Sequence, residues 1–574
     1  MRAPYFVLSF ALASSALAGP PYRKAAVASP HPYASEAGAE ILAQGGNAVD
    51  AAVATAFVIA VVDPYHSGLG GGGFALVYDA KKKQVRVLDF RETAPAGATR
   101  EMFLDAQGNV IPKKSTDLGA SVGVPGAVAG YLELHRTYGK LSRKAVLAPA
   151  IRIAKKGSWV TPKYAFRANH RADCLRQNAE AAKIFLRPDA SGVPAAPAVG
   201  TQIPQRDLAR TLTAISARGE TAFYKGAVAK AIVEVVQATG GLITEKDLTS
   251  YRPVWREPLW GSYRGHKLAT MPPPSAGGLA LVQTLGALEQ RYPDGVPYRE
   301  PKAIHYFAEV LRRVYADRNK YLGDPAFVQI DLPRLSSPTY ITQLTSGINP
   351  EKATPSAQVL AAPADALKGA SEAFQERKQT SHLSVVDEAG NAVALTTTVN
   401  YYFGSCLVPK GTGVVLNDQM DDFTAKPFVP NIYGLAMGES NAVGPGRRPV
   451  SSMTPTLVFQ KGSPDRIFMA VGSPGGSTIP TTVIQTLSNV IDHGMNASRA
   501  VGQGRVHHQY LPDAIWVDPD GLEPSTARAL EAMGHTLRPT EVWGDAELVL
   551  VDPQTGVRYG ASDPRNEGSP AGID

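Results

Sequence analysis

The sequence has very few cysteines, which limits how its fold can be cross-linked. Cys174 and Cys406 are the only two among 574 residues. A framework of several disulfides, of the kind that small secreted domains use, is therefore excluded, although a single bridge is not. We expect two free or buried thiols.

A strong charge imbalance is also absent. The formal net charge is +7 and 19% of the residues are charged, which is mild for a chain of this length and does not imply a nucleic-acid groove. The one compact lysine triplet, at residues 81–83, lies between two strand-like segments and is typical of a solvated turn. With 44% hydrophobic residues, the composition indicates a globular protein. We predict no nucleic-acid partner.

No apolar run is long enough to cross a membrane. The best candidate, residues 5–12, is shorter than the ~20 residues that a span needs, so no stable membrane span is predicted. Arg2 precedes this run and small residues follow it at Ala16 and Ala18, which is the pattern of a secretory signal peptide. We predict that residues 1–18 are removed and that the mature chain is secreted, most simply to the periplasm or otherwise outside the cell.

Three short motifs do not fit the chemistry that they suggest. His507 and His508 are adjacent and would point in different directions, so no metal site is predicted. The glycines at 68–73 match the dinucleotide pattern GxGxxG, but a strand-like segment follows where a helix is needed. Ser121 lies in a GxSxG pattern, yet the polar residues 113–117 precede it in place of a buried strand.

The secondary-structure pattern mixes helices and strands. Asn47 is placed to cap a helix that Pro64 ends, and Gly390 and Asn391 suit the tight turn of a hairpin. We predict helices at residues 34–44, 47–62, 126–135, 205–218, 228–239, 304–321 and 478–492, and strands at residues 74–78, 84–90, 382–387 and 392–399. The small and polar residues 356–377 indicate an exposed connection.

Residues 379–400 carry the most specific pattern, QTSHLSVVD followed by a turn and NAVALTTTVN. This segment resembles the gamma-glutamyltranspeptidases, N-terminal nucleophile hydrolases that cut themselves before the first threonine of the motif. Here that bond is Gln379–Thr380. An internal threonine hydroxyl is a weak nucleophile without a base. The cut would free an α-amino group with a pKa near ~7.7–8.0, which can take the hydroxyl proton.

The strand after the turn carries further matches to this family. Its period of two places Thr396, Thr398 and Asn400 on one face, beside the strand that Thr380 leads. By resemblance, Thr398 orients the Thr380 hydroxyl, and Asn400 contacts the glutamyl part of the substrate.

The resemblance also assigns the recognition of the substrate's α-amino and α-carboxylate groups. Gln419 and Asp422 are expected to bind the ammonium, because an ammonium needs acceptors and a countercharge. Arg91, Ser451 and Ser452 are expected to bind the carboxylate, since a guanidinium fork matches that planar anion.

Two glycines and a loop complete the set of site residues. Gly475 and Gly476 precede a helix, and by resemblance their N–H groups form the oxyanion hole. Residues 427–438 resemble the lid loop of some family members, with Tyr433 as its gate.

The resemblance covers the chain from about residue 25 to its carboxyl end. It implies an α/β protein with a four-layer αββα sandwich, made as a zymogen that divides into a large subunit (residues 19–379) and a small one (residues 380–574), which stay associated. It implies an acyltransferase and hydrolase that holds the γ-glutamyl group of glutathione or a related compound as an ester on Thr380. Water, an amino acid or a peptide then accepts the group, and no cofactor is implied.

Three alternatives stay open. An acylase of the same superfamily would act on glutaryl-type amides and would have little use for the ammonium-binding Asp422. A secreted binding protein could keep the fold without catalysis, although the intact Thr380, Gly475 and Gly476 argue against it. A serine hydrolase would depend on Ser121.

Overall fold

The computed structural model describes residues 19–360 and 379–574. The predicted signal peptide and most of the predicted exposed connection therefore lie outside the described residues. Residues 356–360, at the start of that connection, include the short helix α16 (Ser356–Val359).

Two seven-stranded antiparallel sheets form the centre of the molecule. The first has the order β1 (Pro21–Tyr22), β20 (Arg558–Ser562), β19 (Glu547–Val551), β15 (Ser463–Gly472), β14 (Thr456–Gln460), β11 (His266–Thr270) and β10 (Leu259–Tyr263). The second has the order β21 (Ala571–Ile573), β2 (Ala25–Ala28), β12 (Ser381–Val386), β13 (Ala392–Thr398), β3 (Gly72–Asp79), β4 (Gln84–Asp89) and β9 (Val254–Arg256).

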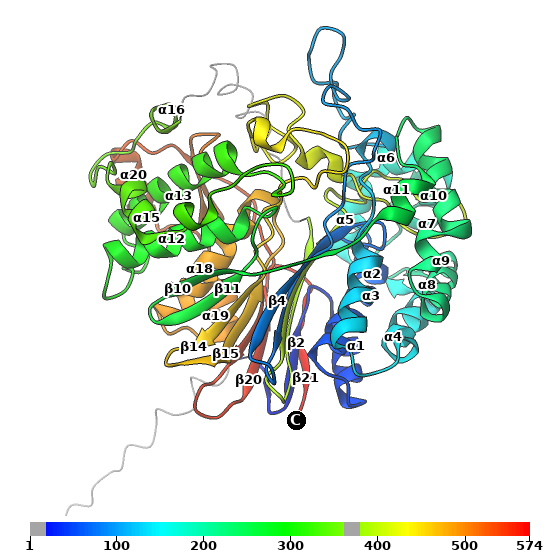
Figure 1. Cartoon of the computed structure of the whole chain (residues 1–574), viewed down its shortest axis with the longest axis horizontal. Coiled ribbons are helices and arrows are strands. Elements are labelled where there is room, and N and C mark those ends of the chain that lie inside the picture. Colours follow the sequence, from blue (N-terminus) through cyan, green and yellow to red (C-terminus); the bar gives the residue numbers. More distant parts are fainter. Residues whose placement is uncertain (1–18, 361–378) are drawn as a thin grey trace, which may run out of the picture.

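Helices cover the outer face of each sheet, as Figure 1 shows. The second sheet packs against α1 (Pro32–Ala43), α2 (Ala48–Val62) and α3 (Ala127–Tyr138), and the same hydrophobic core is completed by α4 (Arg143–Lys156), α8 (Arg206–Arg218) and α10 (Gly226–Ala238). The first packs against α12 (Gly277–Arg291), α18 (Ile479–Ile491) and α19 (Ala497–Gly502), and its core is completed by α13 (Pro301–Tyr321) and α20 (Pro524–Ala532). Phe74 and Leu76 of one sheet meet Leu457 and Phe459 of the other in a buried layer between them. The predicted four-layer αββα sandwich is confirmed.

The predicted helices and strands near the site are confirmed to within a few residues. The Asn47 side chain accepts hydrogen bonds from the N–H groups of Val49 and Asp50, both at 3.0 Å, and so caps α2. All residues of α2 are buried, because this helix lies between the second sheet and the other helices. The predicted helix at 478–492 begins with a 3-10 turn at Gly476–Thr478 before α18.

The glycines at 68–73 bring two strands into close contact. They lead into β3, so a strand follows them as predicted. A Cβ on Gly71 would lie 1.9 Å from the Thr398 carbonyl oxygen, and one on Gly73 would lie 2.1 Å from that of Thr396. Glycine is required here because β3 approaches β13, the strand that carries Thr398.

The expectation of free thiols is wrong. Cys174 and Cys406 form a disulfide with their Cα atoms 5.8 Å apart, across a sequence separation of 232 residues. The fold brings α6 (Ala172–Arg176) against the loop that follows β13, where both sulfurs are buried beside Tyr164 and Phe403. Sequence spacing alone gave no sign of this proximity.

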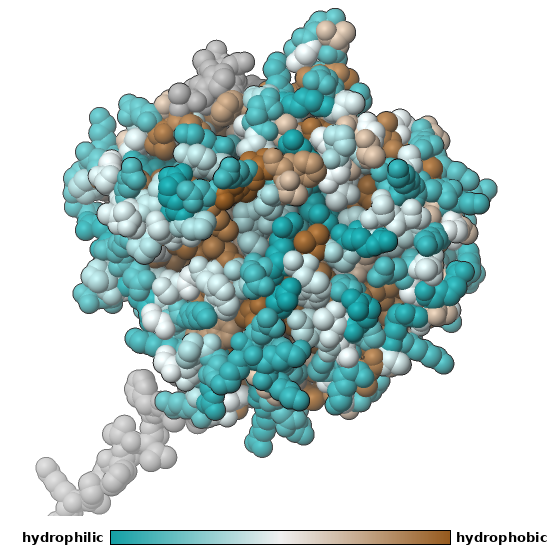
Figure 2. Space-filling view, in the orientation of Figure 1, coloured by the Kyte–Doolittle hydropathy of each residue, from teal (hydrophilic) through white to brown (hydrophobic). Residues whose placement is uncertain are grey.

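The outer surface is mostly polar. Figure 2 shows hydrophilic side chains over most of the visible face, with hydrophobic ones mainly in crevices between elements. Within residues 19–360 and 379–574, no helix has both the length and the apolar character that a membrane span requires.

Candidate active site

A small cavity of about 20 Å³ lies where the carboxyl end of β13, the start of β12 and several loops meet. Its lining contains every predicted site residue except Gln379 and Gly475. The lining residues are Arg91, Arg318, Thr380, Thr398, Asn400, Gln419, Asp422, Tyr433, Leu435, Val450, Ser451, Ser452, Met453, Gly476 and Ile479.

Thr380 stands at the entrance to β12 with a strained backbone. Its φ of +88° lies in a region that β-branched residues rarely adopt. Its side-chain oxygen lies 3.0 Å from that of Thr398, and Thr398 in turn accepts a hydrogen bond from the Asn400 N–H at 2.9 Å. In the described chain Thr398 is the hydrogen-bond partner of the Thr380 hydroxyl, and no imidazole or carboxylate is placed to act as its base.

The carbonyl group before Thr380 is held by one of the predicted oxyanion-hole glycines. The Gly475 N–H donates to the Gln379 oxygen at 3.1 Å. Gly475 and Gly476 have φ values of +131° and +55°, which a residue with a side chain adopts only at a cost. These backbone angles turn the Gly475 N–H toward the Gln379–Thr380 bond.

An ion pair also lines the cavity. Arg91 follows β4, is fully buried, and makes a short contact through Nη2 with Asp422 Oδ2. Gln419 Nε2 donates to the same Asp422 oxygen at 2.7 Å. The other amide atom, Gln419 Oε1, is buried without a hydrogen-bond partner in the described chain, so it is available to a donor on a ligand.

The paired serines and the predicted lid also face this cavity. The hydroxyl of Ser451 accepts from the Met453 N–H at 3.0 Å. Tyr433 is 4% exposed and donates through its hydroxyl to Asn400 Oδ1 at 2.8 Å. The loop is therefore in place over the cavity, fastened to the strand that bears Thr398.

Two other sequence patterns have structural roles away from the cavity. Thr396 shares a face with Thr398, but its hydroxyl bonds His382 Nδ1 at 2.8 Å and does not reach the cavity. Burial lowers the pKa of His382 to about 3, which keeps the imidazole neutral. Ser121 lies in a 3-10 turn and donates to the Leu118 carbonyl at 2.7 Å, so it lacks the strand-to-helix elbow of a serine hydrolase.

The sequence model of the gamma-glutamyltranspeptidase family matches residues 34–573. The chain belongs to this family. It is 42% identical over 541 residues to a glutathione hydrolase proenzyme of Escherichia coli (strain K12), covering 94% of this chain and 90% of that protein. It is 40% identical over 579 residues to a glutathione hydrolase proenzyme of Pseudomonas aeruginosa, covering 98% and 97%.

A solved structure similar to this gamma-glutamyltranspeptidase family member supports the same fold. The cephalosporin acylase from Bacillus halodurans superposes with a TM-score of 0.81 at 27% identity, covering 100% of this chain and 99% of that one. The sequence is thus closer to the glutathione hydrolase proenzymes than to this acylase, although both share the architecture.

Two charged residues at this site of the family member were not predicted from the sequence. Arg318 projects from α13 into the cavity, and its position inside a helix gave no sign of that. Glu92 follows Arg91 and is fully buried, and neither of its carboxyl oxygens has a hydrogen-bond partner in the described chain. Its Oε2 lies 3.8 Å from Arg91 Nη1.

Glu92 should make the stability of this protein depend on pH. Burial raises the pKa of Glu92 from 4.5 to about 8, so the folded state holds a proton that the unfolded state has lost. Stability is therefore lost as pH rises from about 4.5 to about 8. We expect the free energy of unfolding of Glu92→Gln to exceed that of the wild type by about 1–3 kcal/mol at pH 8 and to differ little from it near pH 4.5. Thermal melts of both proteins at the two pH values measure this, and an equal difference at both would contradict it.

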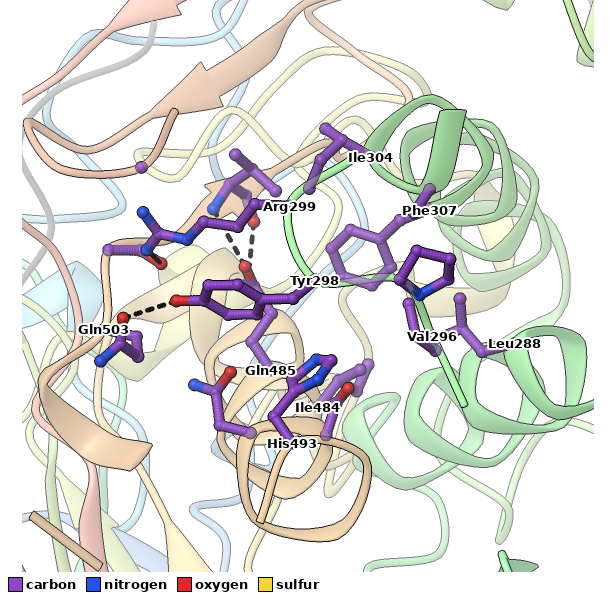
Figure 3. Close-up of a pocket in the computed structure, with 17 residues that line it drawn as sticks. Leu288, Val296, Tyr298, Arg299, Ile304, Phe307, Ile484, Gln485, His493 and Gln503 are labelled. Carbon is purple, nitrogen blue, oxygen red and sulfur yellow. Dashed lines mark hydrogen bonds between the residues drawn. The ribbon is translucent and has the colours of Figure 1, made fainter. Parts of the chain in front are cut away.

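A different pocket lies among α12, α13 and α18 (Figure 3). Leu288, Phe307 and Ile484 give it an apolar wall, and Tyr298 donates to Gln503 across its rim at 2.7 Å. None of the predicted site residues lines it. No group of three or more potential metal ligands occurs within the described residues.

Proposed function

We propose that this protein is a gamma-glutamyltransferase and glutathione hydrolase that cleaves itself between Gln379 and Thr380 and then uses Thr380 as its nucleophile. The main support is that Thr380 lines the same cavity as the Arg91–Asp422 ion pair, while the Gly475 N–H donates to the Gln379 carbonyl just before Thr380. Family membership and the glutathione hydrolase proenzymes among its relatives point to the same activity.

The proposed self-cleavage starts from the arrangement in the uncut chain. The Thr380 oxygen attacks the Gln379 carbonyl carbon, and the Gly475 N–H stabilises the negative charge on the carbonyl oxygen. The peptide C–N bond then breaks, the hydroxyl proton passes to the departing nitrogen, and an ester joins Gln379 to the Thr380 side chain. Water hydrolyses this ester, which leaves a carboxylate on Gln379 and a free amine on Thr380. Release of the strain at Thr380 favours the cut.

The proposed reaction on the substrate repeats these steps with a new base. The free amine of Thr380 accepts the proton of its own hydroxyl, which attacks the γ-amide carbonyl of a compound such as glutathione. Gly475 and Gly476 stabilise the oxyanion, and Thr398 orients the attacking oxygen. The amide nitrogen leaves with the proton, and water or the amine of an amino acid or peptide releases the γ-glutamyl group.

The ion pair in the cavity suits the zwitterionic α-centre of a γ-glutamyl group. Arg91 and Asp422 neutralise each other in the absence of a ligand. The substrate's carboxylate can replace Asp422 beside Arg91, while its ammonium replaces Arg91 beside Asp422 and also donates to Gln419 Oε1. The buried charges stay paired throughout this exchange, so binding leaves none of these four charges isolated.

Processing and secretion belong to the same proposal. The cut would separate residues 19–379 from residues 380–574, but β12 pairs with β2 and β13 pairs with β3, so both fragments share one sheet and remain associated. Removal of residues 1–18 would accompany export to the periplasm or the outside of the cell.

Comparing γ-glutamyl and glutaryl anilides tests this function against the acylase alternative, because the two acyl groups differ only by the ammonium. We expect the wild type to prefer the γ-glutamyl anilide. We expect Asp422→Asn to lower kcat/KM for that substrate by about 30-fold or more, since the buried ammonium loses its countercharge, and to affect the glutaryl anilide much less.

Glu439→Gln is a matched control, because Glu439 is an exposed carboxylate on a nearby loop that pairs with Arg100. It should leave both rates unchanged. A wild type that preferred the glutaryl anilide would overturn the proposed function in favour of the acylase.

A further inference from the structure

Arg318 is a buried cation that forms no ion pair with any of the described residues. It is 4% exposed, its Nη2 donates to the Ser452 hydroxyl at 3.3 Å, and its Nη1 donates to Asn319 Oδ1 at 3.3 Å. Its Nε has no hydrogen-bond partner among the described residues. No carboxylate of the described residues lies within ion-pair distance of its guanidinium group. Desolvation lowers the pKa of Arg318 to about 10, which still leaves it protonated at neutral pH.

Burying an unpaired charge is costly, so a residue of this kind needs a reason to be there. The other arginine of the cavity is already neutralised, because Arg91 pairs with Asp422. The cavity therefore has one positive charge in excess, and it belongs to Arg318. An anionic group on the ligand would compensate it.

Arg91 and Arg318 contact the two ends of one short segment, residues 449–452. Arg91 Nε donates to the Pro449 carbonyl at 3.2 Å, whereas Arg318 Nη2 reaches the hydroxyl of Ser452. Ser451 lies between these contacts in the sequence, and both serines line the same cavity. A carboxylate that binds the serines would thus lie close to both guanidinium groups.

We propose that Arg318 is a further substrate-binding residue, which together with Ser452 holds the α-carboxylate of the acyl group. This rests on the proposed function. Arg318 then selects for substrates that carry a free carboxylate at this position, and it does so independently of the ammonium that Asp422 recognises.

The test compares a γ-glutamyl anilide that has a free α-carboxylate with its α-carboxamide counterpart. The ratio of the two kcat/KM values measures discrimination for the carboxylate. We expect Arg318→Gln to reduce this ratio by about 10-fold or more, mainly through KM, and Arg318→Lys to reduce it less because the charge remains. If Arg318 had only a structural role, Arg318→Gln would lower kcat/KM for both substrates equally and leave their ratio unchanged.

Arg313→Gln is the matched control, because Arg313 is a buried arginine on the same helix that pairs with Glu309. It should leave the ratio as in the wild type even if it weakens the fold. If Arg318→Gln yields no soluble protein, Arg318→Lys decides, and a ratio equal to that of the wild type overturns the proposal. A wild type inactive on γ-glutamyl anilides would instead reject the proposed function, so the two failures can be told apart.

Discussion

Denaturing electrophoresis of the purified protein should give one full-length band without reductant and two bands with it. The proposed cut separates Cys174 from Cys406, because Cys174 lies in the fragment 19–379 and Cys406 in the fragment 380–574. The disulfide between them would keep the fragments covalently joined after the peptide bond is broken. Amino-terminal sequencing of the smaller band should begin at Thr380.

Two variants test the peptide-bond cleavage and the disulfide link separately. Thr380→Ala should stay as one band with or without reductant and lose at least about 10⁴-fold in activity, because both the nucleophile and its amine are lost. Cys406→Ser should give two bands under both conditions. Fully active wild-type protein that remained one band after reduction would refute self-cleavage, whereas two bands without reductant would refute only the covalent link.

Gly475→Ala should slow both self-cleavage and substrate turnover by about 10²–10³-fold, the usual cost of losing one oxyanion-hole donor. A Cβ at this position would lie 2.6 Å from Thr478 Oγ1, and the φ of +131° disfavours any side chain. The backbone must move, and with it the N–H that reaches Gln379. Band intensities over time measure the cut, and release of anilide measures turnover.

Gly462→Ala is the control for backbone strain alone. Gly462 has a φ of +75° in the turn between β14 and β15, and a Cβ there meets nothing within 4 Å. The Gly462→Ala protein should cleave itself and turn over substrate at the rates of the wild type. Normal cleavage in Gly475→Ala would show that this N–H has no part in the first reaction.

Local signals were enough to predict the elements that carry Thr380, the proposed nucleophile. The alternation in residues 382–399 and the turn at Gly390 define the β12–β13 hairpin, and a period of two already places Thr398 and Asn400 on the Thr380 side. Helix α2 was predictable because its cap, Asn47, and its terminator, Pro64, act within a few residues.

Contacts between distant segments could not be predicted in the same way. Arg318 lies in a helix with an ordinary amphipathic pattern, and it contacts Ser452, which is more than a hundred residues away in the sequence. The disulfide likewise depends on how α6 meets the loop after β13. Glu92 follows a strand end, and nothing in the sequence around it indicates that it is fully buried.

The central position of the β12–β13 hairpin has a consequence for biosynthesis. These two strands lie between β2 and β3 in the sheet. They are synthesised after β2 and β3, so the later part of the polypeptide supplies the middle strands, and the earlier part supplies the strands on either side of them. Halves produced from separate genes would each expose unpaired strand edges, which favour aggregation. If the proposed cut follows folding, residues 19–379 act as an intramolecular chaperone for residues 380–574, because both are present in one polypeptide while the sheet forms.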